Sequence, residues 1–248
     1  MQFNNNKIGY LEIITGPMFS GKTSRLQNIY KQYKICDVKT IIINYVDDTR
    51  YSDSNLEGST ALQPALPGST VLQPALPGST VLQPALPGST VLQPALPGST
   101  SYLYSHDKHI IPCMMASSLF DLIDLNNINE TNDEKIKEFL ECSIILINEC
   151  QFFNDIVNWT LIAVEKYKKC VYICGLDSDF RRNKFGNWLD LIPYCDKLTK
   201  LKSICCECKN DYALFTHRKG PEIEQKLIGG QDQYIPLCRN CFMHMNGS

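Results

Sequence analysis

The segment Gly16–Thr23 (GPMFSGKT) constrains the fold of this chain more than any other, because it matches the GxxxxGK[ST] phosphate-loop pattern. That pattern forms a site only between a strand and a helix, and the flanking segments Ile8–Thr15 and Lys22–Ile35 predict these two elements. The glycines let backbone N–H groups surround a phosphate, and the helix N-terminus adds positive potential. We therefore expect a nucleoside triphosphate with Mg²⁺ to bind here, rather than an ordinary glycine-containing turn.

Each residue type in this loop has an expected role. Lys22 would neutralise the β- and γ-phosphates, and Thr23 would offer its hydroxyl to Mg²⁺. The residues expected to contact the nucleotide are Gly16, Pro17, Met18, Phe19, Ser20, Gly21, Lys22 and Thr23.

Strand and helix patterns alternate through residues 1–200. Apolar runs typical of fully buried strands occur at Val38–Asn44, Ser143–Ile147 and Cys170–Gly175. Helical patterns occur at Ser117–Leu125, Asn132–Glu141 and Phe153–Lys168. Buried runs separated by helices indicate a parallel sheet with helices on both faces. The expected fold class is therefore α/β, of the P-loop NTPase type, with residues 1–200 as the main domain.

Residues 58–104 interrupt this alternation. The decapeptide GST(V/A)LQPALP recurs four times, and the four copies contain eight of the 13 prolines of the chain. Two prolines per unit remove backbone donors and disfavour both a helix and a central strand. We interpret the segment as a polyproline-like or disordered insertion, a passenger loop rather than a binding platform.

Residues 201–248 carry two closely spaced cysteine pairs, Cys205-x-x-Cys208 and Cys238-x-x-Cys241, separated by 29 residues. Two such pairs can surround one Zn²⁺ tetrahedrally, so we expect a small zinc-ribbon domain with one structural zinc rather than four free thiols. Cys206 is a near miss, because its spacing to Cys208 is less usual than that of Cys205. Seven further cysteines are scattered singly and are expected in the core, namely Cys36, Cys113, Cys142, Cys150, Cys170, Cys174 and Cys195. Zinc ribbons often bind nucleic acid, but acidic residues here offset the lysines, so the ribbon is interpreted as a clamp.

Composition excludes several other classes. The net charge is −2, which argues against a protein that coats nucleic acid or an anionic membrane. No apolar run approaches the roughly 20 residues that span a bilayer, and the N-terminus lacks the apolar core of a signal peptide. We therefore expect a cytoplasmic protein with reduced cysteines and no membrane or nucleic-acid partner.

The order of the motifs resembles the type II thymidine kinases of cells and large DNA viruses. After GPMFSGKT come the segments DTRY, NECQFF, GLDSDF and KFG, and then the two cysteine pairs with IGG between them. The resemblance covers nearly the whole chain except the repeats. It implies a P-loop domain, a zinc-bearing lasso domain, a homotetramer (or homodimer), and phosphate transfer from ATP to thymidine.

The resemblance also implies roles for individual residues. Glu149, which follows a buried strand at the carboxyl edge of the sheet, would be the general base that takes the proton of the sugar 5′-hydroxyl. Lys22 and Arg50 would be the other catalytic residues, and Asp48, Asn148 and Gln151 would join the ATP and magnesium contacts. A glutamate that merely caps the next helix is the alternative for position 149.

A flat, apolar thymine ring requires aromatic and aliphatic walls with a few amide-like contacts. The walls implied by the resemblance are Met18, Phe152, Leu176, Phe180, Phe185, Thr216 and Tyr234. The segment that would lie along the base edge comprises Gln225, Lys226, Leu227, Ile228 and Gly229. Gly229 and Gly230 lack a Cβ and so permit close approach of the backbone.

Asn148 departs from the family pattern, in which an aspartate associated with magnesium precedes the glutamate. Asparagine keeps one acceptor oxygen but loses the charge. We expect a working kinase with weakened metal affinity, in which Asn148→Asp raises turnover or lowers the magnesium requirement. Two alternatives stay open: a kinase of broader pyrimidine deoxynucleoside specificity, and a catalytically silent nucleotide-binding or zinc-ribbon interaction protein.

Overall fold

A computed structural model describes residues 8–48, 101–104, 110–128, 133–227, 229–230 and 232–247. These residues all belong to one compact unit. Two predicted site residues, Arg50 and Ile228, lie outside the described residues, as does residue range 58–100 of the predicted insertion.

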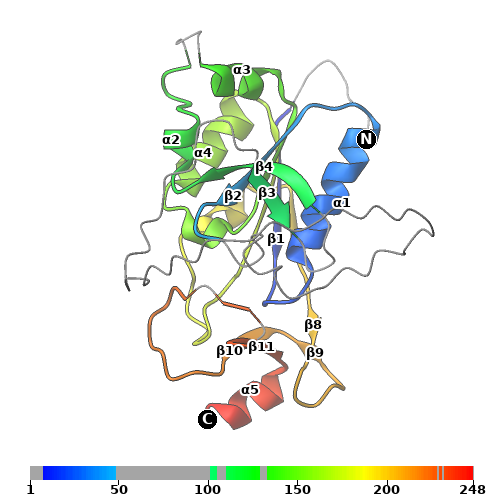
Figure 1. Cartoon of the computed structure of the whole chain (residues 1–248), viewed down its shortest axis with the longest axis vertical. Helices are drawn as coiled ribbons and strands as arrows, with labels where there is room; N and C mark the ends of the chain where they lie inside the picture. The colour runs from blue at the N-terminus through cyan, green and yellow to red at the C-terminus, as the bar shows by residue number, and fades with distance from the viewer. Residues whose placement is uncertain are drawn as a thin grey trace, which may run out of the picture. The chain divides into compact units, whose positions relative to one another are not determined.

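A seven-stranded sheet forms the centre of the molecule, in the order β3-β4-β2-β5-β6-β1-β7 (Figure 1). Every neighbouring pair is parallel except β3 with β4. The strands are β1 Tyr10–Thr15, β2 Thr40–Tyr45, β3 Ser101–Tyr104, β4 Ile110–Ala116, β5 Ile144–Ile147, β6 Cys170–Gly175 and β7 Lys197–Lys200. The predicted parallel sheet is confirmed, and its central strands are the apolar runs of the sequence.

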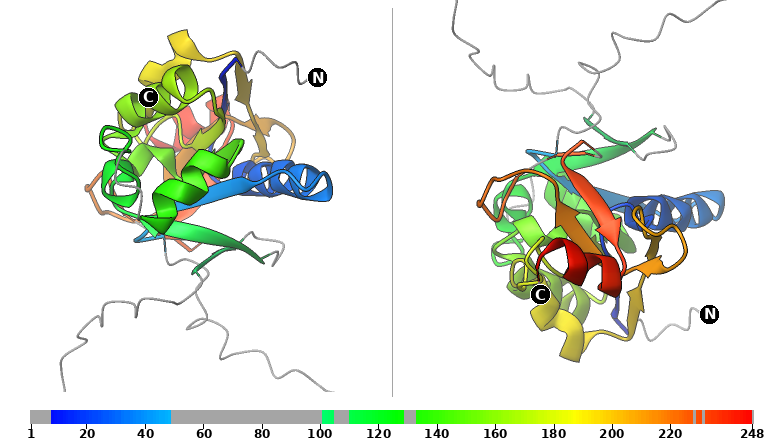
Figure 2. Two further views of the ribbon diagram at one scale, coloured as in Figure 1. Left: turned by 90° about the horizontal axis from the view of Figure 1, so that it is seen from above. Right: turned by 90° about the horizontal axis from the view of Figure 1, so that it is seen from below.

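Helices cover both faces of this sheet (Figure 2). The helical elements are α1 Lys22–Ile35, α2 Leu119–Leu122, α3 Glu134–Glu141, η2 Cys150–Phe152, α4 Ile156–Leu161, η3 Ile162–Lys166 and η4 Trp188–Tyr194. Side chains alternate between the two faces along each strand: Ile13 packs into the cluster that includes α3 and α4, whereas Ile14 packs into the cluster under α1. Two separate apolar cores therefore fix the strand register, since a one-residue slip would exchange every side chain between them.

Most predicted elements occur near where the sequence placed them, but several differ. The helix expected over Ser117–Leu125 is only α2, Leu119–Leu122, and η4 was not predicted. The helix expected over Phe153–Lys168 begins only at Ile156 and continues as π-helix over Ile162–Lys166. Strands β4 and β7 were missed; β4 contains Pro112, and β7 has a largely exposed, polar pattern. The last four residues of the predicted insertion form the edge strand β3, so the insertion ends earlier than 104.

The C-terminal segment folds into small antiparallel pieces rather than into the sheet. Strands β8 (Ser203–Ile204) and β9 (Tyr212–Ala213) pair with each other, as do β10 (Phe215–Arg218) and β11 (Tyr234–Leu237). Helix α5 (Arg239–Met245) follows, and Phe242 on it packs with Leu237 and Ala213 in a cluster of its own. None of the helices in the described residues has both the length and the apolar character needed to cross a bilayer.

Candidate active site

Four parallel strands deliver the predicted polar residues to one edge of the sheet. The carboxyl ends of β1, β6, β5 and β2 lead into Gly16, Leu176, Asn148 and the Asp47–Asp48 pair. The register places Thr15 beside Gly175 and Ile147 beside Ile43, so these ends are level with one another. Ligands of open α/β sheets bind at this edge.

The glycine-rich loop (Gly16–Thr23) has the backbone shape of an anion site. Gly16 has φ of 154°, Gly21 has φ of 82°, and Phe19 lies between them at 62°. A Cβ on Gly16 would come within 2.7 Å of both Leu201 O and Ser20 Oγ, so only glycine fits there. Helix α1 starts directly after Gly21 without a side-chain cap or an acidic residue in its first turn, which leaves its N-terminus suited to a phosphate.

Two more features of this loop fit a bound triphosphate. The hydroxyl of Ser20 is buried and has no hydrogen-bond partner among the described residues. The Lys22 side chain is buried, and its Nζ donates to Pro17 O at 2.8 Å, which keeps the ammonium over the loop. An unpartnered hydroxyl and a tethered cation in one concave loop are the groups that a phosphate would engage.

Glu149 adopts the left-handed backbone conformation, with φ of 55°, and its side chain is only 7% exposed. Gln151 Nε2 donates to Glu149 Oε2 at 2.5 Å, while Gln151 Oε1 accepts from Leu176 N at 2.9 Å. The amide of Gln151 thus links the carboxylate to the end of β6. A buried, hydrogen-bonded carboxylate differs from the exposed helix cap that was the alternative for this position.

The thiol of Cys174 lies close enough to three charged residues of this edge for each of them to affect its pKa. Burial raises its pKa most, the negative charges of Glu149 and Asp48 raise it further, and Lys22 lowers it. Cys174 therefore remains protonated, and its Sγ donates to Asn148 Oδ1 at 2.9 Å. Glu149, Lys22 and Asp48 therefore all act electrostatically on this one buried sulfur.

Asn148 contacts two further residues at the sheet edge. Its Nδ2 donates to Asn44 Oδ1 at 2.9 Å, and its Oδ1 faces the Thr23 hydroxyl at 3.5 Å. Asn44 in turn donates from Nδ2 to Asp48 Oδ2 at 3.3 Å. Sequence reasoning missed Asn44, which looked like the last residue of an apolar strand; a polar residue at the carboxyl end of a buried strand was the available signal.

A cavity of about 30 Å³ lies between the sheet edge and the C-terminal segment. Nine of the predicted substrate residues line it, namely Met18, Leu176, Phe180, Phe185, Thr216, Gln225, Leu227, Gly229 and Tyr234. This volume holds one or two water molecules, far less than a pyrimidine ring. A nucleoside can therefore enter only after residues around the cavity rearrange.

Phe152 and Lys226 differ from the prediction, because neither lines the cavity. The Phe152 ring packs on Tyr45 at 5.0 Å and on Phe185 at 5.4 Å, so it supports the wall from behind. Lys226 Nζ donates to Tyr45 Oη at 2.9 Å and pairs with Asp47 at 3.1 Å. Its side chain thereby fastens the C-terminal segment to the end of β2.

Arg218, which sequence reasoning missed, organises the segment that closes the cavity. The residue is 4% exposed, and its guanidinium lies 4.0 Å from the centre of the Phe180 ring. It donates to three backbone carbonyls, those of Glu222, Glu224 and Gln225, and to the Tyr234 hydroxyl. The available sequence signal for this role was an arginine shortly before a polar segment that is flanked by Gly220 and Gly229.

The four cysteines of the two pairs, Cys205, Cys208, Cys238 and Cys241, come together as expected. Their sulfur atoms all lie within 4.8 Å of one another, and Cys208 Sγ is 3.9 Å from Cys238 Sγ. Tetrahedral Zn–S bonds of 2.3 Å would set the sulfurs about 3.8 Å apart, so the cluster fits a structural zinc. Burial opposes ionisation of Cys205, but backbone hydrogen bonds outweigh it and lower its pKa to about 6, which favours the thiolate that zinc requires.

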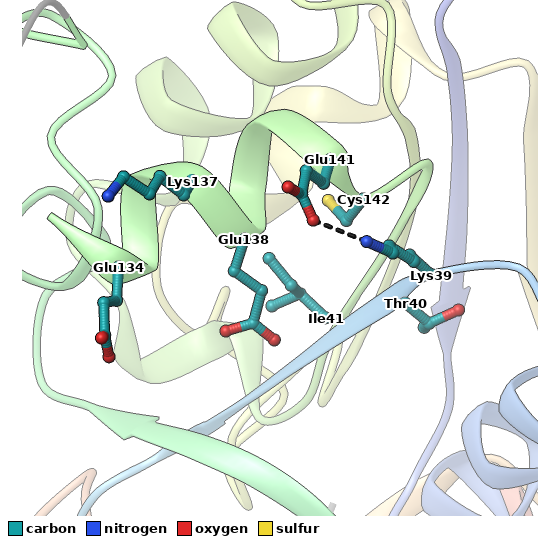
Figure 3. A pocket seen from close by; sticks show the side chains of 8 residues that line it. All are labelled: Lys39, Thr40, Ile41, Glu134, Lys137, Glu138, Glu141 and Cys142. Atoms are coloured by element: carbon teal, nitrogen blue, oxygen red, sulfur yellow. Dashed lines mark hydrogen bonds and ion pairs between the residues drawn. The ribbon is translucent and has the colours of Figure 1, made fainter. Parts of the chain in front are cut away.

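A larger hollow, of about 500 Å³, lies away from these residues (Figure 3). It runs along α3 beside the start of β2, and its lining includes Lys39, Thr40 and Glu141. Thr40 begins β2, so the hollow is at the amino edge of the sheet, opposite to the glycine-rich loop. The Lys39–Glu141 ion pair that crosses it at 2.6 Å is mostly exposed and so adds little stability. The larger hollow contains none of the predicted site residues that the structure describes, whereas nine of them line the smaller cavity.

Comparison with known proteins gives consistent matches. The family profile described as "Thymidine kinase" matches residues 9–64 and 99–242. The thymidine kinase of Choristoneura fumiferana entomopoxvirus is 34% identical over 238 residues, which cover 95% of this chain and 97% of the relative. The sheeppox virus (strain KS-1) thymidine kinase is 31% identical over 234 residues, covering 94% and 97%. The human cytosolic thymidine kinase is 29% identical over 234 residues, covering 94% and 73%.

Proposed function

The chain belongs to the thymidine kinase family, and from that premise we propose that it transfers the γ-phosphate of ATP to the 5′-hydroxyl of thymidine. The products are ADP and thymidine 5′-phosphate. One observation carries the proposal: Glu149 is a buried carboxylate, held by Gln151, at the sheet edge that also carries the glycine-rich loop and Lys22.

The glycine-rich loop binds the triphosphate of ATP in this mechanism. Backbone N–H groups and the N-terminus of α1 surround the phosphates, Lys22 releases Pro17 O to neutralise the β- and γ-phosphates, and the Ser20 hydroxyl gains a partner. Mg²⁺, when bound, neutralises charge on the phosphates, and Thr23, Asn148 and Asp48 would hold it or its waters. We assign Arg50 to the phosphates as well, on the resemblance alone.

Glu149 acts as the general base. Its carboxylate accepts the proton of the thymidine 5′-hydroxyl as that oxygen attacks the γ-phosphorus and the bond to the β-phosphate oxygen breaks. Gln151 holds the carboxylate in one orientation, so little rearrangement is needed at the moment of reaction. Binding acceptor and donor at one sheet edge supplies the in-line geometry.

The nucleoside occupies the cavity once the C-terminal segment has moved outward. Met18, Leu176 and Phe185 offer apolar contacts to the ring, and the backbone of Gln225, Leu227 and Gly229 offers polar groups to the base edge. The four cysteines would hold one structural Zn²⁺, which fixes both flanks of this segment. Residues 201–248 thus act as a lasso domain, and residues 1–200 as the kinase domain.

Two further proposals rest on family membership alone. We propose that the active form is a homotetramer and that the protein works in the cytosol, where thymidine salvage would supply DNA precursors. Size-exclusion chromatography with light scattering tests the first, and imaging of a tagged protein tests the second.

The experiment that tests the function incubates the pure protein with ATP, Mg²⁺ and each deoxynucleoside, and measures the monophosphate formed. Thymidine should be the preferred acceptor, and Glu149→Gln should lower kcat by about 10²–10⁴-fold because the base is lost. Glu141→Gln, which changes an exposed glutamate near the opposite sheet edge, is the matched control and should keep normal turnover.

Two results would contradict the proposal. Equal turnover of deoxycytidine or deoxyuridine would indicate broader specificity, and ATP binding without any monophosphate would indicate a silent nucleotide-binding protein. A Glu149→Gln variant with unchanged kcat would exclude Glu149 as the base.

A further inference from the structure

Four polar side chains form a row beside the glycine-rich loop. Asn44 Nδ2 donates to Asp48 Oδ2 at 3.3 Å, and Asn148 Nδ2 donates to Asn44 Oδ1 at 2.9 Å. At the other end, Asn148 Oδ1 faces the Thr23 hydroxyl at 3.5 Å, which is long for an O–H···O hydrogen bond. Asn44 and Asn148 are each 2% exposed, so bulk water does not compete for their contacts.

The chemistry at both ends of the row fixes the direction of each amide. An ionised carboxylate only accepts, so Asn44 turns its NH₂ group to Asp48 and leaves its oxygen for Asn148. Asn148 therefore presents its NH₂ group to Asn44 and its oxygen to Thr23 and the Cys174 thiol, a donor. Reversing either amide would set two acceptors or two donors against each other at a buried contact.

We propose that Asn44 is a positioning residue for the metal side of the active site. It holds the Asn148 amide with the oxygen toward Thr23, where that oxygen and the Thr23 hydroxyl together meet the cation or its bound water. The inference rests on the proposed function only in identifying this cation as the Mg²⁺ of ATP.

This pairing makes positions 44 and 148 a matched set. With aspartate at position 148, a carboxylate would face Asn44 Oδ1, so two acceptors would meet. Rotating the Asn44 amide would not help, because its oxygen would then face the Asp48 carboxylate. Lysine at 44, which only donates, would satisfy both carboxylates. From the sequence we expected Asn148→Asp to raise turnover or to lower the magnesium requirement. We now expect that effect only when Asn44→Lys is made in the same protein.

The first experiment measures thermal unfolding of the nucleotide-free protein for the wild type, Asn148→Asp, Asn44→Lys and the double variant. Each single change should lower the midpoint by about 3 °C or more, because a buried donor or acceptor loses its partner. The double variant should regain at least half of the summed loss. If its loss equals the sum of the two single losses, the amides are not a matched pair and the inference fails.

The second experiment uses Mn²⁺ as a paramagnetic probe and measures its affinity for the protein with ATP, in the absence of thymidine. Asn44→Leu should weaken Mn²⁺ binding about tenfold, as loss of an outer-sphere partner does. Gln27→Leu is the matched control: it removes another buried amide, which donates to Leu103 O, and should lower stability without changing Mn²⁺ affinity.

The outcomes separate the inference from the proposed function. Unchanged Mn²⁺ affinity in Asn44→Leu overturns the positioning role of Asn44. A wild-type protein that binds Mn²⁺ with ATP but does not phosphorylate thymidine overturns the proposed function, while a tenfold loss in Asn44→Leu still supports the inference. A wild-type protein that binds no Mn²⁺ with ATP overturns both.

Discussion

At the scale of single residues, Glu149 combines an unfavourable backbone with a well-held side chain. A left-handed conformation costs a non-glycine residue roughly 1–2 kcal/mol, and Glu149 has it directly after the last residues of a buried strand. The hydrogen bond from Gln151 and the burial of β5 maintain it. Backbone strain of this kind is often found at functional sites, and Glu149 combines it with burial and a hydrogen-bonded carboxylate.

Gln151 provides a test at this scale. Gln151→Leu should lower kcat by about 10- to 100-fold, because Glu149 loses its donor and Leu176 N loses its acceptor. From the sequence we expected Gln151 to contact ATP, but its amide bonds Glu149 and Leu176 N instead. We therefore expect the Kd for ATP to stay within about twofold. Steady-state kinetics and equilibrium ATP binding measure the two effects, and an equal loss in both would mean that Gln151 acts on the whole fold.

At the scale of elements, the segment between β10 and β11 depends on a single side chain for its shape. Residues 219–227 contain no regular secondary structure, and Arg218 collects three of their carbonyl groups. The planar guanidinium presents several donors in fixed directions, which one ammonium group cannot reproduce. Arg218 therefore sets where the backbone of residues 225–227 lies relative to the cavity.

Arg218→Lys should raise the KM for thymidine about tenfold or more, because the segment loses its common anchor. Arg182→Lys is the control, since the Arg182 guanidinium packs on Phe215 and Phe242 of the C-terminal cluster and not on Phe180. Initial-rate kinetics with varied thymidine measure the effect. A normal thymidine KM in Arg218→Lys would show that the three carbonyl contacts do not set the substrate-binding position.

The two cysteine pairs lie before and after the same segment in the chain, so the four-cysteine cluster holds both of its flanks. The protein should contain one zinc per chain by elemental analysis, and Cys208→Ser should lower that content and weaken thymidine binding. ATP binding should persist, because the glycine-rich loop belongs to the sheet. Cys36, which we expected in the core from the sequence, is exposed and lies outside the cluster. Cys36→Ser is therefore the control and should keep the zinc. Full zinc content in Cys208→Ser would exclude this cluster as the site.

At the scale of the whole molecule, the sequence predicted those features that a local residue pattern determines, namely the buried strands, the glycine-rich loop and the cysteine pairs. The central strands were visible because a strand buried on both faces requires a continuous apolar run. The loop and cysteine spacings were visible because each motif lies within a few residues of chain. The order of the seven strands was not predicted, since pairing partners lie far apart in sequence.

The candidate site divides in the same way. Lys22 and the cysteines were identifiable from motifs, and the aromatic walls only from resemblance to a family. Asn44 and Arg218 were not identified, because their roles arise from contacts with Asn148, 104 residues away, and with carbonyl groups, which every residue has. The contribution of Phe152 to the thymine pocket stays a prediction: a motif gives an order along the chain and not the direction of a side chain, and the Phe152 ring lies against Phe185, which does line the cavity.

A hydrogen bond connects the glycine-rich loop to the C-terminal segment: the backbone N–H of Met18 donates to Thr216 Oγ1 on β10 at 3.0 Å. In the proposed mechanism the C-terminal segment moves outward to admit a nucleoside. If that movement breaks this bond, the backbone N–H of Met18 loses its partner when thymidine binds. The two substrates then cannot bind independently: whatever factor thymidine applies to the affinity for ATP, ATP must apply to the affinity for thymidine.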